Sequence, residues 1–588
     1  MSAPAVSVHQ SPPNRSLPRR LWPWLAAAAT GALLILCFPP WNQGWLCWIA
    51  LTPLISAIFA SSPGHRRGGL RLAALGYLAG WIFFTCTFWW LGSTLAPLFR
   101  TPLLRGLPAL LALYMGLYVA IWSWFVGAVL APDDGSGKRF QNSARNLFIG
   151  CAGAAAWLPL EWVRTWLWGG FGWNPLGVAL HQDLAMIQIV DITGVPGLSF
   201  LIVFVNLMGV IVARRIISEF GPVFLTRIRW EFSATMALVA LVFAYGVHAL
   251  LHQDPSPTVP LRVAAIQPNI PQTEKHDIAM EDDIFERLDR LTGLAALAQP
   301  HPQLFIWPEA ATPRDIDDEL TSNFVIEQAR RAGSALLIGT LELDLEGSYN
   351  IAALITDGGR TRQRYRKMHL VPFGEYLPLR PVFSAIPAVG QLVPSDFTPG
   401  SQPTALTLSD PPIRLGILIC FEDSLGDLTR RFVGRGANVL VNITNDGWFA
   451  KSPAASQHLA NALFRAVENR RPLIRCGNTG ITCAVDIHGR VQTWINPFEE
   501  GFSVRQVSVP TTSSLTFYTR FGDWFTALCS GIALLALLRG IRQRRGGNAP
   551  RGSAFSGRGA QRSGSGENDE PSEPFGRGAG GGPGKRRE

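Results

Sequence analysis

Charged residues are scarce in this sequence: Asp, Glu, Lys and Arg make up 16% of its 588 residues, whereas 48% are hydrophobic. A soluble protein of this size would carry about a quarter charged residues, so much of the chain is expected to lie in lipid. The net charge of +10 does not indicate nucleic-acid binding. Half of the excess follows Ile541, and most of the rest falls in short loops between apolar segments, where basic residues report membrane orientation.

Cysteine is also scarce, with eight residues in the chain. Five of them lie in apolar segments and are expected to be packing residues. Cys420, Cys476 and Cys483 lie elsewhere, and this odd number leaves at least one free thiol. Cys476 and Cys483 either pair across neighbouring strands or stay reduced. No Cys and His spacing suits a metal site, so we expect neither a metal nor a soluble cofactor.

Eight apolar segments approach or exceed the roughly 20 residues that a helix needs to cross a bilayer. They are residues 21–39, 44–61, 70–92, 107–131, 147–166, 197–212, 232–251 and 524–538. The first segment is expected to remain as a helix, because no small-x-small cleavage pattern follows it. Basic residues gather before the first segment, in every second loop and after the last segment. Both termini are therefore expected in the cytoplasm, with the stretch between the last two segments outside.

The sequence predicts five parts. They are a cytoplasmic N-terminal segment (1–20), a seven-helix membrane domain (21–251), an α/β domain outside the membrane (260–509), a C-terminal transmembrane helix (517–541) and a disordered basic cytoplasmic tail (542–588). In the α/β domain, apolar strand-like runs alternate with amphipathic helical patterns, which is typical of a layered fold around one core. The tail is rich in Gly, Ser, Arg and Pro and cannot bury enough apolar surface to fold.

Three reactive side chains each follow an apolar strand in the α/β domain. They are Glu309 in FIWPEAA, Lys367 in RYRKMHLVPFGEY and Cys420 in ILICFED. Each one alone is typical of an ordinary structural residue. Together they supply a base, a cation and a thiol nucleophile, which is what acyl transfer requires. His369 and His458 are alternative bases, although His369 would point away from Lys367 in an extended strand.

These three motifs resemble those of the nitrilase, or carbon–nitrogen hydrolase, superfamily. Together with the apolar segments, the stretches VNITNDGWF and RAVENRRPLIRCGNTGITC resemble the apolipoprotein N-acyltransferase family of bacterial inner membranes. The resemblance covers the chain from the first apolar segment to about Leu538. It implies a polytopic α-helical membrane bundle of about eight spans and an extracytoplasmic, periplasmic domain with a nitrilase-like α-β-β-α sandwich.

The resemblance also implies roles for single residues. Glu309 matches the family's catalytic base, Lys367 its lysine and Cys420 its nucleophile. Glu375, in PFGE, matches a second glutamate that supports the lysine region. Glu422, two residues after the cysteine, matches a further functional position.

Other positions around these motifs depart from the family or have weaker matches. Phe421 stands where the family commonly has Tyr, and His276 stands where it typically has Trp. Trp448 matches an aromatic residue near the pocket entrance, and Trp448 and His276 are candidate contacts to substrate. Asp423 is expected to be an ordinary loop acid.

The stretch 162–177 is rich in Trp and Gly and falls on the same outer face as the α/β domain. It suits either an interfacial aromatic anchor or a portal for acyl chains, with Trp168 as a candidate contact to substrate. Arg164 in the same stretch either snorkels to the membrane surface or contacts a phosphate head group.

The activity that the resemblance implies is a two-step acyl transfer. The thiol of Cys420 takes an acyl chain from a membrane phospholipid as a thioester. The amine of an S-diacylglyceryl-cysteine at a lipoprotein N-terminus then accepts the chain. A membrane-tethered amidase that hydrolyses a small amide, and a transporter or scaffold that only binds lipoproteins, are the alternatives. Few charges within the apolar segments argue against a transporter.

Overall fold

The computed structural model describes residues 17–61, 68–98, 100–131, 140–218, 229–252, 256–275, 277–383, 395–511 and 514–547. Most of the predicted N-terminal segment, and the predicted tail beyond residue 547, lie outside these residues. The unit Met1–Ile541 contains both the apolar helices and the α/β domain.

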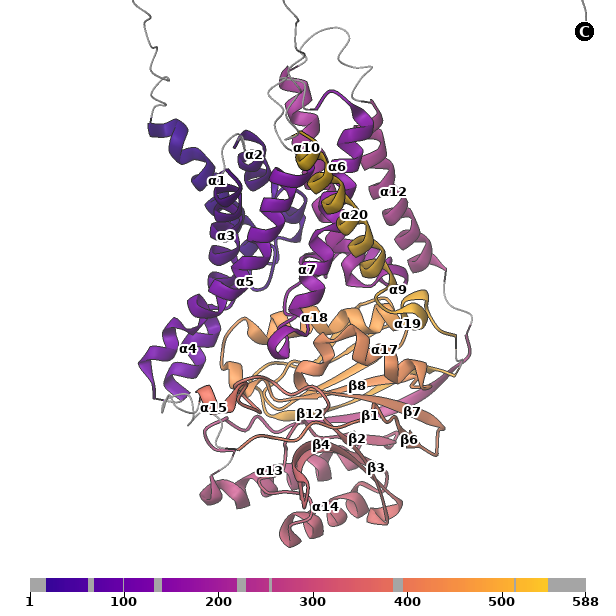
Figure 1. Cartoon of the computed structure of the whole chain (residues 1–588). Helices are drawn as coiled ribbons and strands as arrows, with labels where there is room; N and C mark the ends of the chain where they lie inside the picture. The colour runs from indigo at the N-terminus through magenta and orange to yellow at the C-terminus, as the bar shows by residue number, and fades with distance from the viewer. Residues whose placement is uncertain are drawn as a thin grey trace, which may run out of the picture. The chain divides into compact units, whose positions relative to one another are not determined.

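Apolar helices make up the first half of this unit, and one more helix follows the α/β domain (Figure 1). Among the described residues, five helices are long and apolar enough to cross a bilayer by length and composition. These are Gly68–Thr87, Pro102–Leu130, Val195–Ile217, Trp230–Leu251 and Trp524–Gln543. Shorter apolar helices cover Arg20–Leu36, Gly44–Ala60 and Leu184–Thr193.

The helical elements of this part have the following bounds. They are α1 (Leu17–Leu36), η1 (Gly44–Trp48), α2 (Thr52–Ala60), α3 (Gly68–Thr87), α4 (Trp89–Leu98), η2 (Pro102–Gly106), α5 (Leu107–Trp124), η3 (Phe125–Leu130), α6 (Ser143–Ala155), α7 (Trp157–Arg164), η4 (Leu167–Gly169), η5 (Leu176–Leu180), α8 (Leu184–Ile187), α9 (Val190–Thr193), α10 (Val195–Ser218), α12 (Arg229–Leu251), α19 (Phe517–Phe521) and α20 (Trp524–Gly547).

Three of the eight predicted spans are divided in the structure: the span predicted at 70–92 is divided between α3 and α4, and two others are divided just before a proline. The span predicted at 44–61 consists of η1 followed by α2, and the span predicted at 147–166 is divided between α6 and α7. Each of these last two breaks precedes a proline, Pro53 in the first turn of α2 and Pro159 in the first turn of α7. Proline has no backbone N–H to continue a preceding helix, so it lies in the first turn of a new one.

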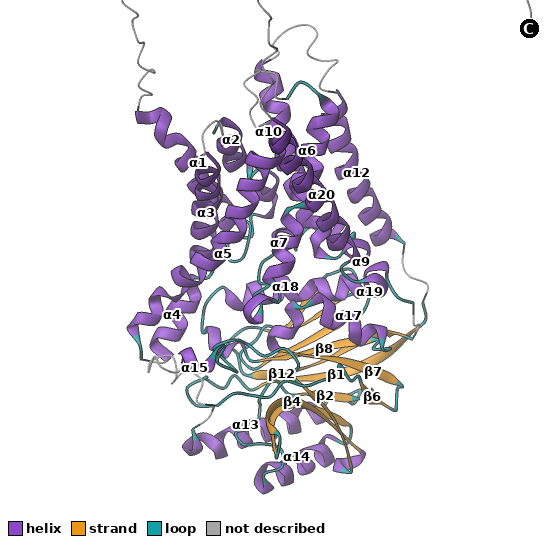
Figure 2. Ribbon diagram, in the orientation of Figure 1, coloured by secondary structure: helices purple, strands orange, loops and turns teal. Residues whose placement is uncertain are grey.

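The α/β domain contains two six-stranded sheets and the helices that cover them (Figure 2). The sheets have the strand orders β12-β1-β2-β3-β4-β5 and β11-β10-β9-β8-β7-β6. The strands are β1 (Thr258–Gln267), β2 (Leu304–Ile306), β3 (Ala335–Asp344), β4 (Gly347–Thr356), β5 (Thr361–Arg366), β6 (Leu406–Leu408), β7 (Ile413–Ile419), β8 (Val439–Thr444), β9 (Leu473–Gly477), β10 (Thr482–Val485), β11 (Val491–Ile495) and β12 (Gly501–Pro510).

The remaining helices of this domain are short or cover the sheets. They are η6 (Ile278–Met280), α13 (Glu281–Ala296), α14 (Glu319–Ala332), η7 (Asp357–Gly359), α15 (Arg380–Phe383), η8 (Cys420–Ser424), α17 (Gly426–Gly434), η9 (Asp446–Phe449) and α18 (Ala454–Asn469). Figure 1 shows α13 and α14 on one side of the two sheets and α17 and α18 on the other. The layers are therefore helix, sheet, sheet and helix.

Burial on both faces explains why residues 263–266 of β1 are all apolar. Val263 and Ala265 belong to the core between the two sheets, whereas Ala264 and Ile266 belong to the core beneath α13 and α14. A strand that is buried on both faces has no polar alternation, as expected for a sheet in the middle of layers.

Helix α18 joins the second sheet to the membrane helices. The side chain of Gln457, near its start, donates hydrogen bonds to the backbone oxygens of Pro39 (3.0 Å) and Thr87 (3.2 Å). The indole N–H groups of Trp90 and Trp173 donate to its amide oxygen at 3.2 and 3.1 Å. One buried amide therefore links three segments of the helical part to the α/β domain.

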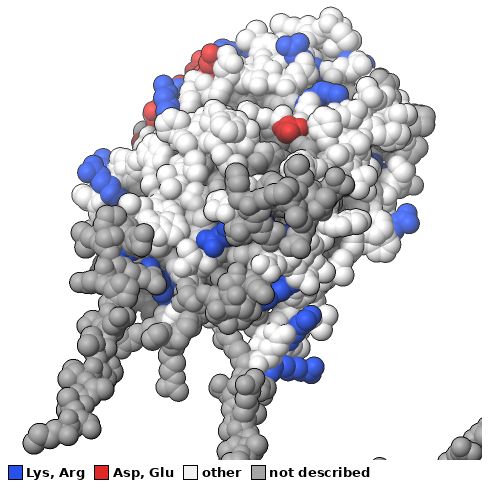
Figure 3. Space-filling model, turned by 90° about the horizontal axis from the view of Figure 1, so that it is seen from above, with Lys and Arg blue, Asp and Glu red and all other residues white. Residues whose placement is uncertain are grey.

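Basic side chains outnumber acidic ones on the face in Figure 3, which is seen from above Figure 1. Among the described residues that entered the prediction of orientation, Arg20 lies in α1, Arg71 in α3, Arg145 in α6, Arg214 and Arg215 in α10, and Arg539 and Arg542 in α20. The loop arginines and lysines at 66, 67, 138 and 139, which also entered the prediction of orientation, lie outside the described residues.

Candidate functional site

The candidate site lies where strands from both sheets end. Strands β1, β2 and β3 are mutually parallel, and so are β7, β8 and β9. The carboxyl ends of parallel strands meet at one edge of a sheet, and polar groups gather there. Glu309 follows β2, Lys367 follows β5 and Cys420 follows β7, so strand ends place all three predicted residues at the site.

Glu309 is buried and accepts hydrogen bonds from three segments. Lys367 Nζ lies 3.1 Å from its Oε1, and Asn350 Nδ2 donates to the same oxygen at 2.8 Å. The backbone N–H of Asn445 donates to Oε2 at 3.0 Å. Burial alone would raise the pKa of Glu309, but the charge of Lys367 and these donors outweigh it and hold the pKa below its ordinary value. Glu309 is therefore an ionised carboxylate at neutral pH.

Lys367 is fully enclosed and pairs with two carboxylates. Besides Glu309, its Nζ lies 2.8 Å from Glu375 Oε1. Asn350 Nδ2 also donates to that oxygen of Glu375, at 2.9 Å. Burial alone would lower the pKa of Lys367, but the two carboxylates raise it well above its ordinary value. The predicted support of the lysine by Glu375 thus corresponds to a direct ion pair.

Cys420 begins the turn η8 with a backbone φ of +52°, a conformation that residues other than glycine rarely adopt. This bend turns the residue out of β7 at the strand's end, and 9% of its surface is exposed. Burial and the charge of Glu309 raise the thiol pKa well above its ordinary value, while Lys367 and a hydrogen bond with Thr444 act in the opposite direction. The resting site therefore holds a thiol beside a carboxylate.

Glu422 connects the turn of Cys420 to the strand that leads to Lys367. Its Oε1 accepts from Tyr365 Oη at 2.8 Å and from the backbone N–H of Met368 at 2.7 Å. Its Oε2 accepts from the N–H of Ile419 at 2.9 Å. Burial raises the pKa of Glu422 to about 7, although these donors favour the ionised form. Glu422 is thus a buried structural link within the site.

Asp423 was expected to be an ordinary loop acid, and this expectation is wrong. Asp423 is fully buried and forms ion pairs with Arg475 and, at 2.8 Å, with His458 Nε2. Asp446 completes the cluster, 2.9 Å from His458 Nδ1 and 2.8 Å from Arg475 Nη2. Buried charges are tolerated where they are paired and hydrogen-bonded, as they are here. We call these four residues the buried ionic cluster.

Neither His369 nor His458, the two alternative bases, has the surroundings that a catalytic base needs. His458 belongs to the buried ionic cluster, where both ring nitrogens face carboxylates. Burial lowers the pKa of His369 to about 4, and the charge of Lys367 acts in the same direction. The ring of His369 stacks on Phe421 with centroids 5.7 Å apart.

Phe421 is buried in a stack of aromatic rings from the stretch 162–177. Its ring lies 6.0 Å from Phe171 and 5.8 Å from Trp173, with interplanar angles of 7° and 8°. This packing brings the Trp-rich stretch directly against the turn that contains Cys420. The absence of the tyrosine hydroxyl at Phe421 leaves an apolar ring that fits among apolar rings.

The three candidate contacts to substrate differ in their surroundings. Trp168 is 73% exposed, and its ring lies 5.1 Å from that of Tyr114. Trp448 is half-buried in η9, next to Phe449, whose ring packs edge-on against Trp90 at 4.8 Å. His276 lies outside the described residues.

Lys275, next to His276, is a residue of the site that sequence reasoning missed. It follows β1, is 2% exposed, and donates a hydrogen bond from Nζ to the backbone oxygen of Glu309 at 2.8 Å. The sequence pattern could have indicated it. Lys275 follows the buried strand β1, and the parallel strand next to β1 is β2, which leads to Glu309.

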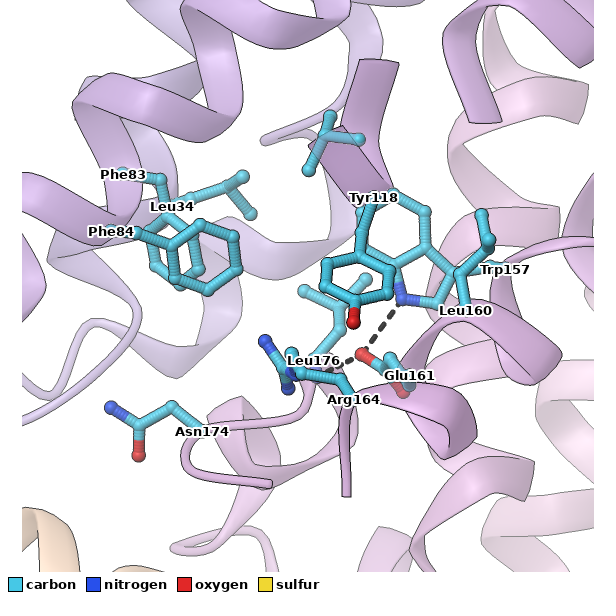
Figure 4. Close-up of a pocket in the computed structure, with 11 residues that line it drawn as sticks. Leu34, Phe83, Phe84, Tyr118, Trp157, Leu160, Glu161, Arg164, Asn174 and Leu176 are labelled. Carbon is cyan, nitrogen blue, oxygen red and sulfur yellow. Dashed lines mark hydrogen bonds between the residues drawn. The ribbon is translucent and has the colours of Figure 1, made fainter. Parts of the chain in front are cut away.

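A separate pocket lies among the apolar helices (Figure 4). Apolar rings such as Phe84 line it, and Glu161, Arg164 and Asn174 are its polar residues. Glu161 accepts hydrogen bonds from the indole of Trp157 and the N–H of Leu176, both at 2.7 Å. The volume of this pocket is about 30 Å³, which is room for one or two water molecules.

Arg164 is 4% exposed, with its guanidinium 5.4 Å above the ring of Phe84. Its Nε and Nη2 have no hydrogen-bond partner among the described residues. The snorkelling alternative for Arg164 is therefore wrong, because a snorkelling side chain ends in water. Contact with a phosphate stays a prediction.

Two predictions concerned a disulfide and a metal site in the α/β domain. Cys476 and Cys483 are buried free thiols, so the disulfide alternative is wrong. Cys476 Sγ donates to the backbone oxygens of Ile266 and Ile306 at 3.3 and 3.4 Å. Among the described residues, no group of three or more His, Cys, Asp and Glu side chains is arranged to hold a metal ion.

Comparisons with known families cover both parts of the chain. The family described as the apolipoprotein N-acyltransferase N-terminal domain matches residues 30–208, and the carbon-nitrogen hydrolase family matches residues 262–516. The crystal structure of an amidase from Nesterenkonia sp. is similar with a TM-score of 0.33 and 20% identity, over 43% of this chain and 91% of that chain.

Relatives named apolipoprotein N-acyltransferase match almost end to end. The protein of Geobacter metallireducens is 34% identical over 540 residues, which cover 89% of this chain and 96% of that protein. The protein of Brucella melitensis is 32% identical and covers 79% of this chain and 86% of its own length. The protein of Rhodopseudomonas palustris is 30% identical, and the match covers 90% of this chain and 97% of that protein.

Proposed function

This chain belongs to the apolipoprotein N-acyltransferase family, and we propose that Glu309, Lys367 and Cys420 carry out its acyl transfer. The donor is a membrane phospholipid, and the acceptor is the N-terminal amine of an S-diacylglyceryl-cysteine on an apolipoprotein. The observation that carries the proposal is the contact of ionised Glu309 with Lys367 at the strand ends where Cys420 is bent into the site. The amidase alternative is not favoured, because the matched relatives are acyltransferases over nearly their whole length.

In the first step, Glu309 removes the thiol proton of Cys420 as Sγ attacks the ester carbonyl carbon of the phospholipid. Lys367 and the backbone N–H of Phe421 stabilise the oxyanion that forms. The ester C–O bond then breaks, and Glu309 returns the proton to the leaving glycerol oxygen. The products are a lysophospholipid and an acyl thioester on Cys420.

In the second step, the acceptor amine attacks the thioester carbonyl carbon and Glu309 takes a proton from the nitrogen. The C–S bond breaks, the sulfur of Cys420 recovers a proton from Glu309, and an amide remains on the lipoprotein. The ionised state of Glu309 in the resting site suits both steps, because each begins with removal of a proton.

We further propose that the chain lies in the bacterial inner membrane with eight spans, both termini cytoplasmic and the α/β domain periplasmic. The basic helix ends support this orientation. The stack of Phe421 on Phe171 and Trp173 supports a site next to the apolar helices, where both lipid substrates arrive. Trp168 and Trp448 are proposed contacts to these substrates, and Trp168 has the exposure that this role needs.

The test is mass spectrometry of a lipoprotein's N-terminal peptide after co-expression with wild type or with Cys420→Ala. Wild type is expected to give the N-acylated peptide, and Cys420→Ala the peptide with a free amine. N-acylation by Cys420→Ala would refute the proposed nucleophile. Incubation of the purified wild-type protein with labelled phospholipid is expected to label Cys420 as a thioester, and an unlabelled Cys420 would instead favour the amidase.

A further inference from the structure

Lys275 is a second buried cation in the site. Its Nζ lies 2.8 Å from the backbone oxygen of Glu309, and 2% of the residue is exposed. The sequence contains five lysines in all, and two of them, Lys275 and Lys367, lie enclosed within this site. Burying an ammonium group is costly unless negative charge lies nearby, so this placement calls for an electrostatic explanation.

The loop that carries Lys275 is held firmly against two other strand ends. The backbone N–H of Ile270 donates to Asn478 Oδ1 at 3.0 Å, and Asn478 Nδ2 donates back to the oxygen of Ile270 at 2.8 Å. The side chain of Asn445 donates to Gln272 Oε1 at 2.7 Å. Hydrogen bonds to Ile270 and Gln272 therefore fix the part of the loop that leads to Lys275.

The charges of the site explain what a second cation does. Two carboxylates, Glu309 and Glu375, share the single ammonium group of Lys367 at 3.1 and 2.8 Å. Without another cation this group of three carries a net charge of minus one, and two buried carboxylates that share one cation tend to retain a proton. A protonated Glu309 would not act as a base. Lys275 brings the site to two carboxylates and two ammonium groups.

We infer that Lys275 is a positioning residue that keeps Glu309 ionised and stabilises the negative charge as it moves from Glu309 to Cys420. The inference rests on the proposed function of these two residues. When the proton passes from Sγ to the Glu309 carboxylate, the total charge of the site is unchanged and Lys275 keeps its own proton. Its position suits this transfer, because its charge interacts with both Glu309 and Cys420.

The other charged groups around Glu309 and Cys420 do not supply the positive charge that Lys275 adds. Lys367 is already paired with two carboxylates, and Asp446 adds a negative charge that raises the thiol pKa of Cys420. Burial lowers the pKa of Lys275 to about 8, while Glu309 and Cys420 act in the opposite direction. Lys275 therefore carries its charge at neutral pH.

Alkylation of Cys420 measures this effect without a lipid substrate. Full-length protein in detergent is treated with iodoacetamide from about pH 6 to about pH 10, and the Cys420 peptide is quantified by mass spectrometry. Lys275→Met removes both the charge and the hydrogen bond, whereas Lys275→Gln removes the charge and keeps an N–H donor. Lys451→Met is the matched control, because Lys451 is an exposed lysine of the same domain.

Both Lys275 variants are expected to react roughly tenfold more slowly than wild type at neutral pH. This difference should shrink above about pH 8, where Lys275 of wild type loses its own charge. Lys451→Met should follow wild type. An unchanged profile for Lys275→Met would overturn the inference. A wild-type profile for Lys275→Gln would also overturn it, because the hydrogen bond rather than the charge would then matter. Thermal unfolding identifies a variant that does not fold, in which case the other variant decides.

Failure of this inference is distinguishable from failure of the proposed function. If Lys275→Met alkylates like wild type while wild type still N-acylates a lipoprotein, only the role of Lys275 is refuted. If Cys420→Ala still N-acylates the lipoprotein, the proposed function itself is refuted.

Discussion

Tyr365 donates a hydrogen bond of 2.8 Å to Glu422, and this contact joins two strands that come from different sheets. Tyr365 lies on β5, two residues before Lys367, and Glu422 lies in the turn after β7. The relative position of Lys367 and Cys420 therefore depends on one buried carboxylate.

Tyr365→Phe removes that hydrogen bond and leaves the ring in place. Above its pKa of about 7, Glu422 is ionised, and a hydrogen bond to a charged group contributes about 1.5–3 kcal/mol, so we expect a loss of this size in the free energy of unfolding at about pH 8. Formation of the Cys420 thioester should also slow, because the cysteine turn is less firmly held. Both are measured on purified protein, by thermal unfolding and by labelled phospholipid. Tyr349→Phe, which removes a hydroxyl from β4 of the same sheet, is the control, and an equal loss in both variants would contradict the prediction.

Asn350→Asp tests the electrostatics around the base. Asn350 Nδ2 donates to both Glu309 and Glu375, at 2.8 and 2.9 Å. A third carboxylate at this point removes the donor and adds like charge, so the pKa of Glu309 should rise and thioester formation should fall by roughly a hundredfold at neutral pH.

The pH profile of thioester formation distinguishes this effect from misfolding. Its rising limb should move to higher pH in Asn350→Asp and stay in place in Asn438→Asp, a change that keeps the acceptor for the N–H of Arg414. A fall in rate without any displacement of the limb would count against the electrostatic explanation.

Stability should depend on pH through His458 in the buried ionic cluster. Burial alone would lower the pKa of His458, but Asp423 and Asp446 outweigh it and raise the pKa from 6.5 to about 9. The folded state thus binds the proton more tightly than the unfolded state. The stabilisation is complete below pH 6.5 and is lost as the pH rises through about 9, with a total of at most about 3 kcal/mol.

Thermal unfolding across this window checks the sign. Wild type is expected to melt at progressively lower temperature between pH 6.5 and about 9, and His458→Gln should lack most of this decline. His252→Gln, at an exposed histidine, should behave like wild type. A wild-type midpoint that rises over this range would show that His458 is not protonated in the fold.

Phe421→Ala tests the contact between the cysteine turn and the apolar helices. It removes the buried ring between Phe171, Trp173 and His369 and leaves a cavity. Such a substitution costs about 3–5 kcal/mol in the free energy of unfolding. Phe421→Leu refills part of the space and should recover part of that loss. If Phe421→Ala and Phe421→Leu unfold at the wild-type temperature, the stack does not hold the two parts together.

Local patterns were sufficient to predict Glu309, Lys367 and Cys420 as strand-end residues of one site. An apolar run that stops at a polar residue marks the end of a buried strand, and such ends meet at the edge of a parallel sheet. The layered α/β domain and its apolar helices were also predictable, because burial on both faces leaves residues 263–266 of β1 without polar alternation. The interruptions at Pro53 and Pro159 could have been read from the same local chemistry.

Other features depend on contacts that no local pattern records. Asp423 and Arg475 are 52 residues apart, and only the meeting of β7 with β9 through β8 makes their ion pair. Lys275 contacts the backbone of Glu309, 34 residues away, and so has no partner in its own segment of sequence. The sequence by itself determined which residue types end each strand, since that follows from local burial and hydrogen bonding. The tertiary structure decided which charges face each other, because electrostatic pairing depends on distances that strand order and layer packing set.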